Sequence, residues 1–308
     1  MYSIQILACG SYLPNEKIKN DILNKKFNLD AEWIYQRTGI CYRHYASEGI
    51  SELAIKAGKK IIENYSKDEL KIDAIIVATT TSQRLMPGIA YEVQNALNIE
   101  TCISLDVLAG CSGFINAIDI ARTYIAIGKI ETALVIGVDV LSKFIDKNDL
   151  NTSILMGDGA GAVLIGKCNK KKTYYSFIES DARQKEILTT EYGKALHMDG
   201  KKVYRFAINE TVKNIQKLLE DSGEKLQDIK LIVPHQSNQR ILDKIAMKLE
   251  VNQEKMYTNL KNIGNTFCAS IPIALTEIIE KQLIKEGDKI ILLGYGGGLN
   301  LGSILLEM

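Results

Sequence analysis

The chain alternates between short, uninterrupted apolar runs and longer segments in which apolar positions recur every three or four residues. The short runs predict buried strands, and the longer amphipathic segments predict helices. The predicted strands cover 3–9, 73–79, 101–107, 132–138, 161–166, 229–233, 289–294 and 301–307. The predicted helices cover 50–64, 88–97, 112–127, 205–222, 238–249 and 269–285. This alternation is typical of an α/β protein with mostly buried strands.

The pattern also repeats within the chain. The apolar run 73–79 matches 229–235 at an offset of 156 residues, and 133–137 matches 290–294 at an offset of 157. The helix predicted after residue 111 falls into the same register as the helix 269–285. Because three registers agree, we interpret the chain as two related α/β halves, 1–166 and 167–308. Loops at the carboxyl ends of equivalent strands are then expected to converge, and ligands bind at such places.

Composition restricts the class of protein. The chain has 308 residues, of which 46% are apolar, so it can bury a substantial core. Its 38 Lys and Arg balance 37 Asp and Glu, which argues against a nucleic-acid or membrane-surface partner. No signal peptide or membrane span is recognisable, and we expect a soluble cytoplasmic protein. The six cysteines form no C-x-x-C pair, so neither a zinc site nor a disulfide framework is expected.

One of these cysteines stands where a reactive thiol is expected. Cys111 follows the small residues Ala109 and Gly110, which end an apolar run, and it precedes the periodic segment 114–127. Backbone N–H groups at a helix N-terminus favour the thiolate and predict a lowered pKa for Cys111. The alternative is a cysteine buried for packing alone.

His235 and Asn265 occupy comparable loops of the second half. His235 follows the predicted strand 229–233, and Asn265 precedes the helix that corresponds to the one after Cys111. His44 is interpreted as an exposed or loop residue and His197 as part of a polar loop, both without a catalytic role. Cysteine, histidine and asparagine together favour acyl transfer to sulfur, with the other two side chains stabilising an oxygen that becomes negative. A hydrolase in which His235 is the base for Cys111 is the alternative, and we consider it weaker.

Seven motifs in order resemble those of β-ketoacyl-acyl carrier protein synthase III, the condensing enzyme that starts bacterial type II fatty-acid synthesis and a member of the thiolase superfamily. The resemblance covers nearly the whole chain. The motifs are Glu-Trp-Ile-x-x-Arg-Thr-Gly-Ile (32–40), Gly-Cys-Ser-Gly-Phe (110–114), Gly-Asp-Gly-Ala-Gly-Ala (157–162), Met-Asp-Gly-x-x-Val-Tyr-Arg (198–205), His-Gln-Ser-Asn-Gln-Arg-Ile (235–241), Gly-Asn-Thr (264–266) and Gly-Tyr-Gly-Gly-Gly-Leu (294–299).

The resemblance implies a duplicated thiolase-like fold with five α-β-α-β-α layers, a homodimer, and no metal or bound cofactor. It implies that a short acyl-CoA acylates Cys111. His235 and Asn265 would then hold the thioester oxygen of malonyl-acyl carrier protein while CO2 leaves. The backbone N–H groups of Cys111 and Gly297 would form the oxyanion hole for the acyl carbonyl.

The resemblance also implies the substrate contacts. The residues expected to hold CoA and its pantetheine arm are Trp33, Arg37, Gly200, Tyr204, Ser237 and Asn238. The cations expected to meet the acidic carrier protein are Arg205, Arg240 and Lys248. A solvated basic face is the alternative for these three cations.

Two positions depart from the family pattern. Leu150 stands where an arginine that contacts CoA is common, so other acyl donors stay open. Met86 replaces a phenylalanine at the tip that closes the partner subunit's acyl pocket, and its flexible side chain suits a primer longer or more branched than acetyl. A specialised relative, either an acyltransferase to an amine or alcohol or a condensing enzyme for secondary metabolites or a biotin precursor, is the alternative function. A non-catalytic subunit is a third, which an intact Cys111 disfavours.

Overall fold

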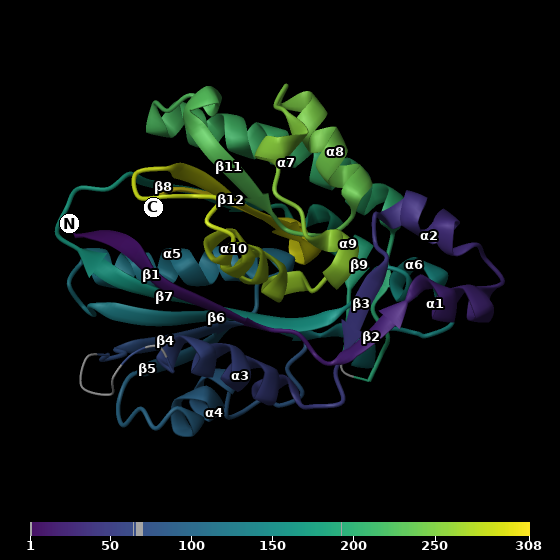
Figure 1. Cartoon of the computed structure of the whole chain (residues 1–308), viewed down its shortest axis with the longest axis horizontal. Coiled ribbons are helices and arrows are strands. Elements are labelled where there is room, and N and C mark those ends of the chain that lie inside the picture. Colours follow the sequence, from purple (N-terminus) through teal and green to yellow (C-terminus); the bar gives the residue numbers. More distant parts are fainter. Residues whose placement is uncertain (1, 64, 66–69, 192) are drawn as a thin grey trace.

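Two β-sheets alternate with three layers of helices in the computed structural model, which describes residues 2–63, 65, 70–191 and 193–308. Helices α3 and α4 cover the outside of one sheet, α5 and α10 lie between the sheets, and α7 and α8 cover the outside of the other (Figure 1). The prediction of a five-layered α/β fold is therefore confirmed. A helix of the central layer must be apolar on both faces, which explains why eight residues of α10 are buried.

The first sheet has the order β1-β7-β6-β4-β5. Its strands are β1 (Ser3–Tyr12), β4 (Ala74–Ala78), β5 (Ile103–Val107), β6 (Thr132–Val140) and β7 (Asp158–Cys168). Strands β5, β4 and β6 run parallel, whereas β7 is antiparallel to both β6 and β1. The second sheet has the order β11-β12-β13-β8. Its strands are β8 (Tyr174–Ser180), β11 (Ile229–Pro234), β12 (Lys289–Gly296) and β13 (Asn300–Glu307).

The second sheet repeats four strands of the first. Strands β11 and β12 are parallel like β4 and β6, β13 is antiparallel to β12 as β7 is to β6, and β8 pairs with β13 as β1 pairs with β7. The shared order and sense confirm the duplicated fold. A division at 166/167 would fall inside β7, and these domain boundaries remain a prediction. Two short ladders add β2 (Glu16–Lys19) with β3 (Tyr42–Tyr45) and β9 (Leu188–Thr189) with β10 (His197–Met198).

Ten α-helices and seven 3-10 turns connect the strands within the described residues. The helices are α1 (Asn20–Phe27), α2 (Ala31–Thr38), α3 (Ile50–Ile62), α4 (Ile89–Ala96), α5 (Gly113–Ala126), α6 (Leu150–Ser153), α7 (Gly200–Ser222), α8 (Gln239–Lys248), α9 (Leu260–Ile263) and α10 (Ser270–Glu280). The 3-10 turns are η1 (Gly110–Ser112), η2 (Leu141–Lys143), η3 (Ala182–Ile187), η4 (Leu226–Asp228), η5 (Gln253–Lys255), η6 (Phe267–Ala269) and η7 (Gly297–Leu299).

All eight predicted strands and six predicted helices are present, with shifted ends. Helix α10 ends at Glu280 rather than 285, and residue 64 of the predicted helix 50–64 lies outside the described residues. The short elements were missed because two to eight residues carry too little periodicity. They are β2, β3, β8, β9, β10, α1, α2, α6 and α9. The prediction that His44 is an exposed or loop residue is wrong: His44 lies in β3, is buried, and its Nδ1 contacts the Pro14 oxygen at 2.5 Å.

The topology brings the candidate loops to one edge. Cys111 follows β5, His235 follows β11 and Gly297 follows β12, each at the carboxyl end of a parallel strand. Helices α5 and α10 are both preceded by a 3-10 turn, η1 and η6, so Cys111 and the segment after Asn265 occupy equivalent places in the two halves. Within the part of the chain that the structure describes, no helix is both long and apolar enough to cross a membrane.

Candidate active site

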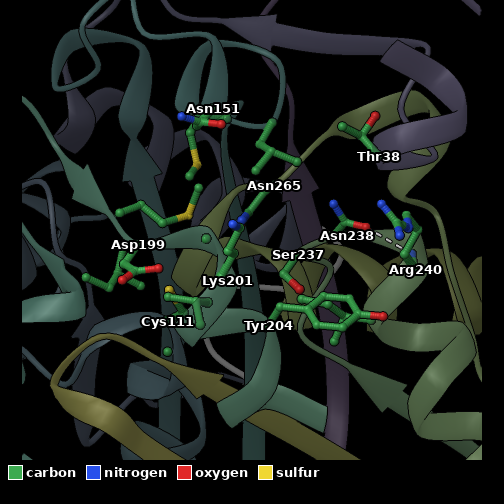
Figure 2. A pocket seen from close by; sticks show the side chains of 18 of the residues that line it. Thr38, Cys111, Asn151, Asp199, Lys201, Tyr204, Ser237, Asn238, Arg240 and Asn265 are labelled. Atoms are coloured by element: carbon green, nitrogen blue, oxygen red, sulfur yellow. Dashed lines mark hydrogen bonds between the residues drawn. The ribbon is translucent and has the colours of Figure 1, made fainter. Parts of the chain in front are cut away.

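Cys111, His235 and Asn265 line one cavity of about 890 Å³. The side chains of Cys111 and Asn265 both point into it (Figure 2). All three residues are at least 95% buried, so their chemistry takes place away from bulk water. A nucleophile and two polar side chains from separate loops therefore share one desolvated space.

Glycines let the backbone of the 294–299 motif pass directly against Cys111. A Cβ added to Gly296 would lie 2.6 Å from the Cys111 Cβ and 2.7 Å from its Sγ. Gly110, at φ +59°, is in the left-handed region, and a Cβ there would lie 2.5 Å from the Gly297 carbonyl oxygen. Only glycine permits this approach, which places backbone N–H groups of Gly297 and Cys111 beside the sulfur.

Burial raises the pKa of the Cys111 thiol, and the carboxyl of Asp139, itself buried, raises it further. Backbone hydrogen bonds from Gly297 and Cys111 oppose this rise without overcoming it. The sequence-based expectation of a lowered pKa is therefore wrong. A helix terminus offers only partial charges, and in a fully desolvated position the loss of water costs the thiolate more than these charges return.

We expect alkylation of Cys111 by iodoacetamide to accelerate steadily with pH. Below a raised pKa the thiolate fraction grows about tenfold per pH unit, so the rate should still be rising at about pH 9. The measurement is the mass of the Cys111 peptide after timed exposure to the reagent at each pH. A rate that levels off below about pH 8 would show that the backbone N–H groups outweigh burial.

His235 is held as a neutral imidazole. Burial lowers the pKa of His235 to about 3, and the rings of Phe267 and Tyr295 lie edge-on to it with centroids at 6.4 and 5.3 Å. Its Nδ1 lies 2.7 Å from Ser270 Oγ, which also lies 2.8 Å from the Phe267 carbonyl oxygen. The Ser270 hydroxyl has one proton: donated to the Phe267 carbonyl oxygen, it leaves Ser270 Oγ to accept from Nδ1–H and Nε2 as an acceptor. Donated to Nδ1 instead, it leaves the imidazole proton on Nε2, which then serves as a hydrogen-bond donor.

Asn265 is oriented by its own loop. The backbone N–H of Phe267 donates to Asn265 Oδ1 at 3.1 Å, so the amide group Nδ2 is left to donate into the cavity. The Asn265 backbone bonds to the segment before β7: its N–H donates to the Leu155 oxygen at 2.9 Å, and its carbonyl accepts from Gly157 N–H at 2.8 Å. Phe267 adopts φ +45°, a left-handed conformation that is costly for a non-glycine residue and recurs at functional sites.

Most of the other predicted site residues line the same cavity. Trp33, Arg37, Gly200, Tyr204, Arg205, Ser237, Asn238 and Arg240 all do so. The guanidinium of Arg37 lies 5.1 Å from the centroid of the Trp33 ring, so the two form one platform on α2. Asn238 joins α8 to α2, since its Oδ1 accepts from Arg240 N–H and its Nδ2 donates to the Arg37 oxygen. Leu150, the departure from the family pattern, also belongs to this wall.

Two predicted residues lie elsewhere. Met86 is 81% exposed and lines a second cavity of about 1090 Å³, as does Gly297. Lys248, at the end of α8, lines neither this cavity nor the first one, and it donates to Asn209 Oδ1 at 2.8 Å. Both cavities reach Cys111, Leu188 and Phe267, so the thiol stands where two spaces meet.

Sequence reasoning assigned no role to Phe267, Ser270 or Tyr295, all of which contact His235. Tyr295 is itself part of the motif 294–299 and Phe267 directly follows the motif 264–266, which is a weak signal. Ser270 begins α10, and nothing in its local sequence relates it to a histidine 35 residues away. Among the described residues, no group of three or more His, Cys, Asp or Glu could hold a metal ion.

Comparison with known proteins places this geometry in one family. Models described as "3-Oxoacyl-[acyl-carrier-protein (ACP)] synthase III" and its C-terminal part match residues 105–185 and 219–308. The chain is 38% identical to the beta-ketoacyl-[acyl-carrier-protein] synthase III of Clostridium acetobutylicum, with 100% of this chain and 99% of the relative covered. It is 37% identical to synthase III 1 of Bacillus cereus, with 99% of both covered.

Solved structures agree. The crystal structure of 3-oxoacyl-[acyl-carrier-protein] synthase III from Aquifex aeolicus superposes with a TM-score of 0.94 at 36% identity and covers 100% of both chains. The synthase III of Pseudomonas aeruginosa gives 0.94 at 31% identity, with 99% of this chain and 98% of that chain covered. The chain therefore belongs to the β-ketoacyl-[acyl-carrier-protein] synthase III family of acyl-transferring condensing enzymes.

Proposed function

We propose that this chain carries out the condensation that starts type II fatty-acid synthesis, taking a short acyl group from CoA and extending it with malonyl-acyl carrier protein. One observation carries the assignment of roles: Cys111, His235 and Asn265 line a single buried cavity whose wall also includes the residues expected to hold pantetheine. Membership of a condensing-enzyme family supports the reaction class.

The first half-reaction is acyl transfer to Cys111. The sulfur attacks the thioester carbonyl of acyl-CoA, and the carbonyl oxygen becomes negative while it accepts hydrogen bonds from the backbone N–H groups of Cys111 and Gly297. The carbon–sulfur bond to CoA then breaks, and the proton of the Cys111 thiol leaves on the CoA thiol. Desolvation raises the free energy of the Cys111 thiolate in this site. The same two backbone N–H groups lower that free energy in part, and so they also help the thiolate to form.

The second half-reaction is a decarboxylative condensation. Malonyl-acyl carrier protein loses CO2, and the electron pair moves onto its thioester oxygen, which accepts hydrogen bonds from His235 Nε2–H and Asn265 Nδ2–H. The mechanism uses the tautomer in which the Ser270 hydroxyl turns from the Phe267 carbonyl oxygen and donates to His235 Nδ1. The enolate carbon attacks the acyl-Cys111 carbonyl, a carbon–carbon bond forms, and the sulfur leaves and takes up a proton. Decarboxylation supplies the carbanion, so the proposed mechanism uses neither a metal nor a bound cofactor.

The channel residues fit a long, thin substrate arm. Trp33 and Arg37 together offer stacking and charge for the adenine and phosphate end of CoA. Gly200, Tyr204, Ser237 and Asn238 line the path between this platform and Cys111. Leu150 supplies no charge to the same wall, so the identity of the acyl donor has to be determined with a panel of acyl-CoAs.

Three exposed cations are proposed to meet the acidic carrier protein: Arg205, Arg240 and Lys248. Within the described residues, none of them forms an ion pair with a carboxylate of this chain, so their charge is available to a partner. We also propose that a second copy of the chain covers the cavity that Met86 lines, because Leu85, Met86 and Leu108 are each more than 80% exposed around it. We expect this homodimer to work in the cytoplasm.

A donor panel tests the function. The protein is incubated with acetyl-CoA and with longer and branched acyl-CoAs, the Cys111 peptide is weighed, and malonyl-acyl carrier protein is added while CO2 is measured. We expect one or more donors to load and CO2 release to follow. If no donor forms an adduct, the acyl-transfer function is wrong. An adduct that releases no CO2 with malonyl-acyl carrier protein would contradict condensation.

A further inference from the structure

The phenol of Tyr295 lies beside His235 in the core of the site. Tyr295 is the penultimate residue of β12, and its side chain is only 2% exposed. Its ring centroid is 5.3 Å from that of His235, with the planes 69° apart, an edge-to-face contact that restricts how the imidazole can turn. Burial raises the pKa of the Tyr295 hydroxyl, so it stays protonated and acts as a hydrogen-bond donor.

The hydroxyl closes the turn that carries His235. Tyr295 Oη lies 2.7 Å from Ser237 Oγ and donates to the His235 carbonyl oxygen at 3.3 Å. The same carbonyl accepts from the backbone N–H of Ser237 at 3.0 Å. Tyr295, Ser237 and the His235 carbonyl therefore form a closed triangle of hydrogen bonds around a turn of three residues.

These hydrogen bonds connect the residue proposed to stabilise the enolate, His235, with one proposed to bind pantetheine, Ser237. In the proposed mechanism His235 donates to the thioester oxygen, whereas Ser237, two residues further on, belongs to the channel proposed for pantetheine. Both residues line the cavity, and Figure 2 shows the side chain of Ser237 there. The turn lies beyond the end of β11 at Pro234, and the backbone N–H of His235 ties its first residue to β12 by donating to the Leu293 oxygen at 2.7 Å. The Tyr295 hydroxyl, from the neighbouring strand β12, contacts both the backbone carbonyl of His235 and the side chain of Ser237 and so links the two positions.

We propose that Tyr295 is a positioning residue for the condensation half-reaction, and that its hydroxyl holds His235 and Ser237 in register along the substrate arm. This inference rests on the proposed function. Acyl loading does not depend on His235 in that mechanism, because the backbone N–H groups of Cys111 and Gly297 stabilise its oxyanion. Loss of the hydroxyl should therefore affect the two half-reactions unequally.

The test compares Tyr295→Phe with wild type in each half-reaction separately. Loading is followed by the mass of the Cys111 peptide with the acyl-CoA that loads fastest, and condensation by CO2 release from enzyme that is already acylated. We expect Tyr295→Phe to lower the kcat of condensation by about 5- to 10-fold, the effect of one lost buried hydrogen bond. The kcat of loading at saturating acyl-CoA should stay within about twofold, because a weaker contact between Ser237 and pantetheine raises the KM of loading rather than lowering its kcat. Tyr174→Phe is the matched control, since its hydroxyl donates to Asp119 at 3.0 Å and lines neither cavity.

Ser237→Ala completes a double-mutant cycle. If the two hydroxyls act as one unit, Tyr295→Phe and Ser237→Ala combined should lower the kcat of condensation no further than Tyr295→Phe alone. Three results would overturn the inference: condensation by Tyr295→Phe at the wild-type rate, an equal loss in loading, or an equal loss in Tyr174→Phe. A wild-type protein that neither loads nor condenses would instead refute the proposed function itself.

Discussion

Cys111→Ala should lose acyl loading completely, a fall of at least about 10⁴-fold in adduct formation, because among the described residues Cys111 supplies the only thiol that lines either cavity. The expected readout is that no acyl-CoA changes the mass of the peptide that contains position 111, and that the variant forms no 3-oxoacyl product. Alanine removes only the sulfur, and the backbone contacts with Gly296 and Gly297 involve atoms that alanine keeps. The variant is therefore expected to fold.

Cys168→Ala is the control for this experiment. Cys168 is a buried free cysteine at the end of β7, and it lines neither cavity at Cys111. It should load at the wild-type rate. An acyl adduct that persists in Cys111→Ala would place the nucleophile elsewhere and would remove the basis of the proposed mechanism.

Asn265→Ala should load normally and condense poorly. Removing one preorganised donor to a developing oxyanion costs about 10²- to 10³-fold in rate, and in the proposed mechanism Asn265 Nδ2 acts only on the enolate oxygen. The measurement is CO2 release from the acylated variant, with loading by mass as the internal reference. The small cavity left by alanine is not expected to disturb Cys111, because Asn265 belongs to a different loop.

Asn265→Asp sharpens this prediction. Aspartate keeps the oxygen that accepts from Phe267 N–H at 3.1 Å but replaces the amide donor with a second acceptor. It should condense at least as slowly as the alanine variant, since a carboxylate repels an enolate. Asn262→Ala, an exposed residue of the same segment, is the control. Wild-type condensation by Asn265→Asp would show that Asn265 does not donate to the enolate.

The sequence predicted the residues that meet in the cavity because each stands at a recognisable place in a repeated pattern. Cys111 precedes the helix of one half, Asn265 precedes the equivalent helix of the other, and His235 follows a strand. Parallel strands bring their carboxyl ends to one edge, so order along the chain was enough to expect convergence. Local sequence could not predict what surrounds them. Phe267, Ser270 and Tyr295 reach His235 from three other elements, which are η6, α10 and β12 respectively.

The pKa of Cys111 also separates what the sequence predicts from what the fold decides. The residues around Cys111 predict a helix N-terminus, and Cys111 does lie just before α5. Whether its pKa is raised or lowered depends on desolvation by all the atoms packed around the sulfur, and on the charge of Asp139 from β6. For the same reason His44, which the local sequence indicated to be an exposed or loop residue, is buried, and burial also lowers its pKa.

The sequence by itself determined the α/β class, the duplicated order of elements and the identity of the cysteine, histidine and asparagine, because periodicity and motif order are local properties of the chain. The tertiary structure decided which of their atoms face the substrate. The Phe267 N–H turns the Asn265 amide, Ser270 holds His235, and burial outweighs the helix terminus at Cys111. Orientation and desolvation both depend on partners distant in sequence, and only the folded chain brings those partners together.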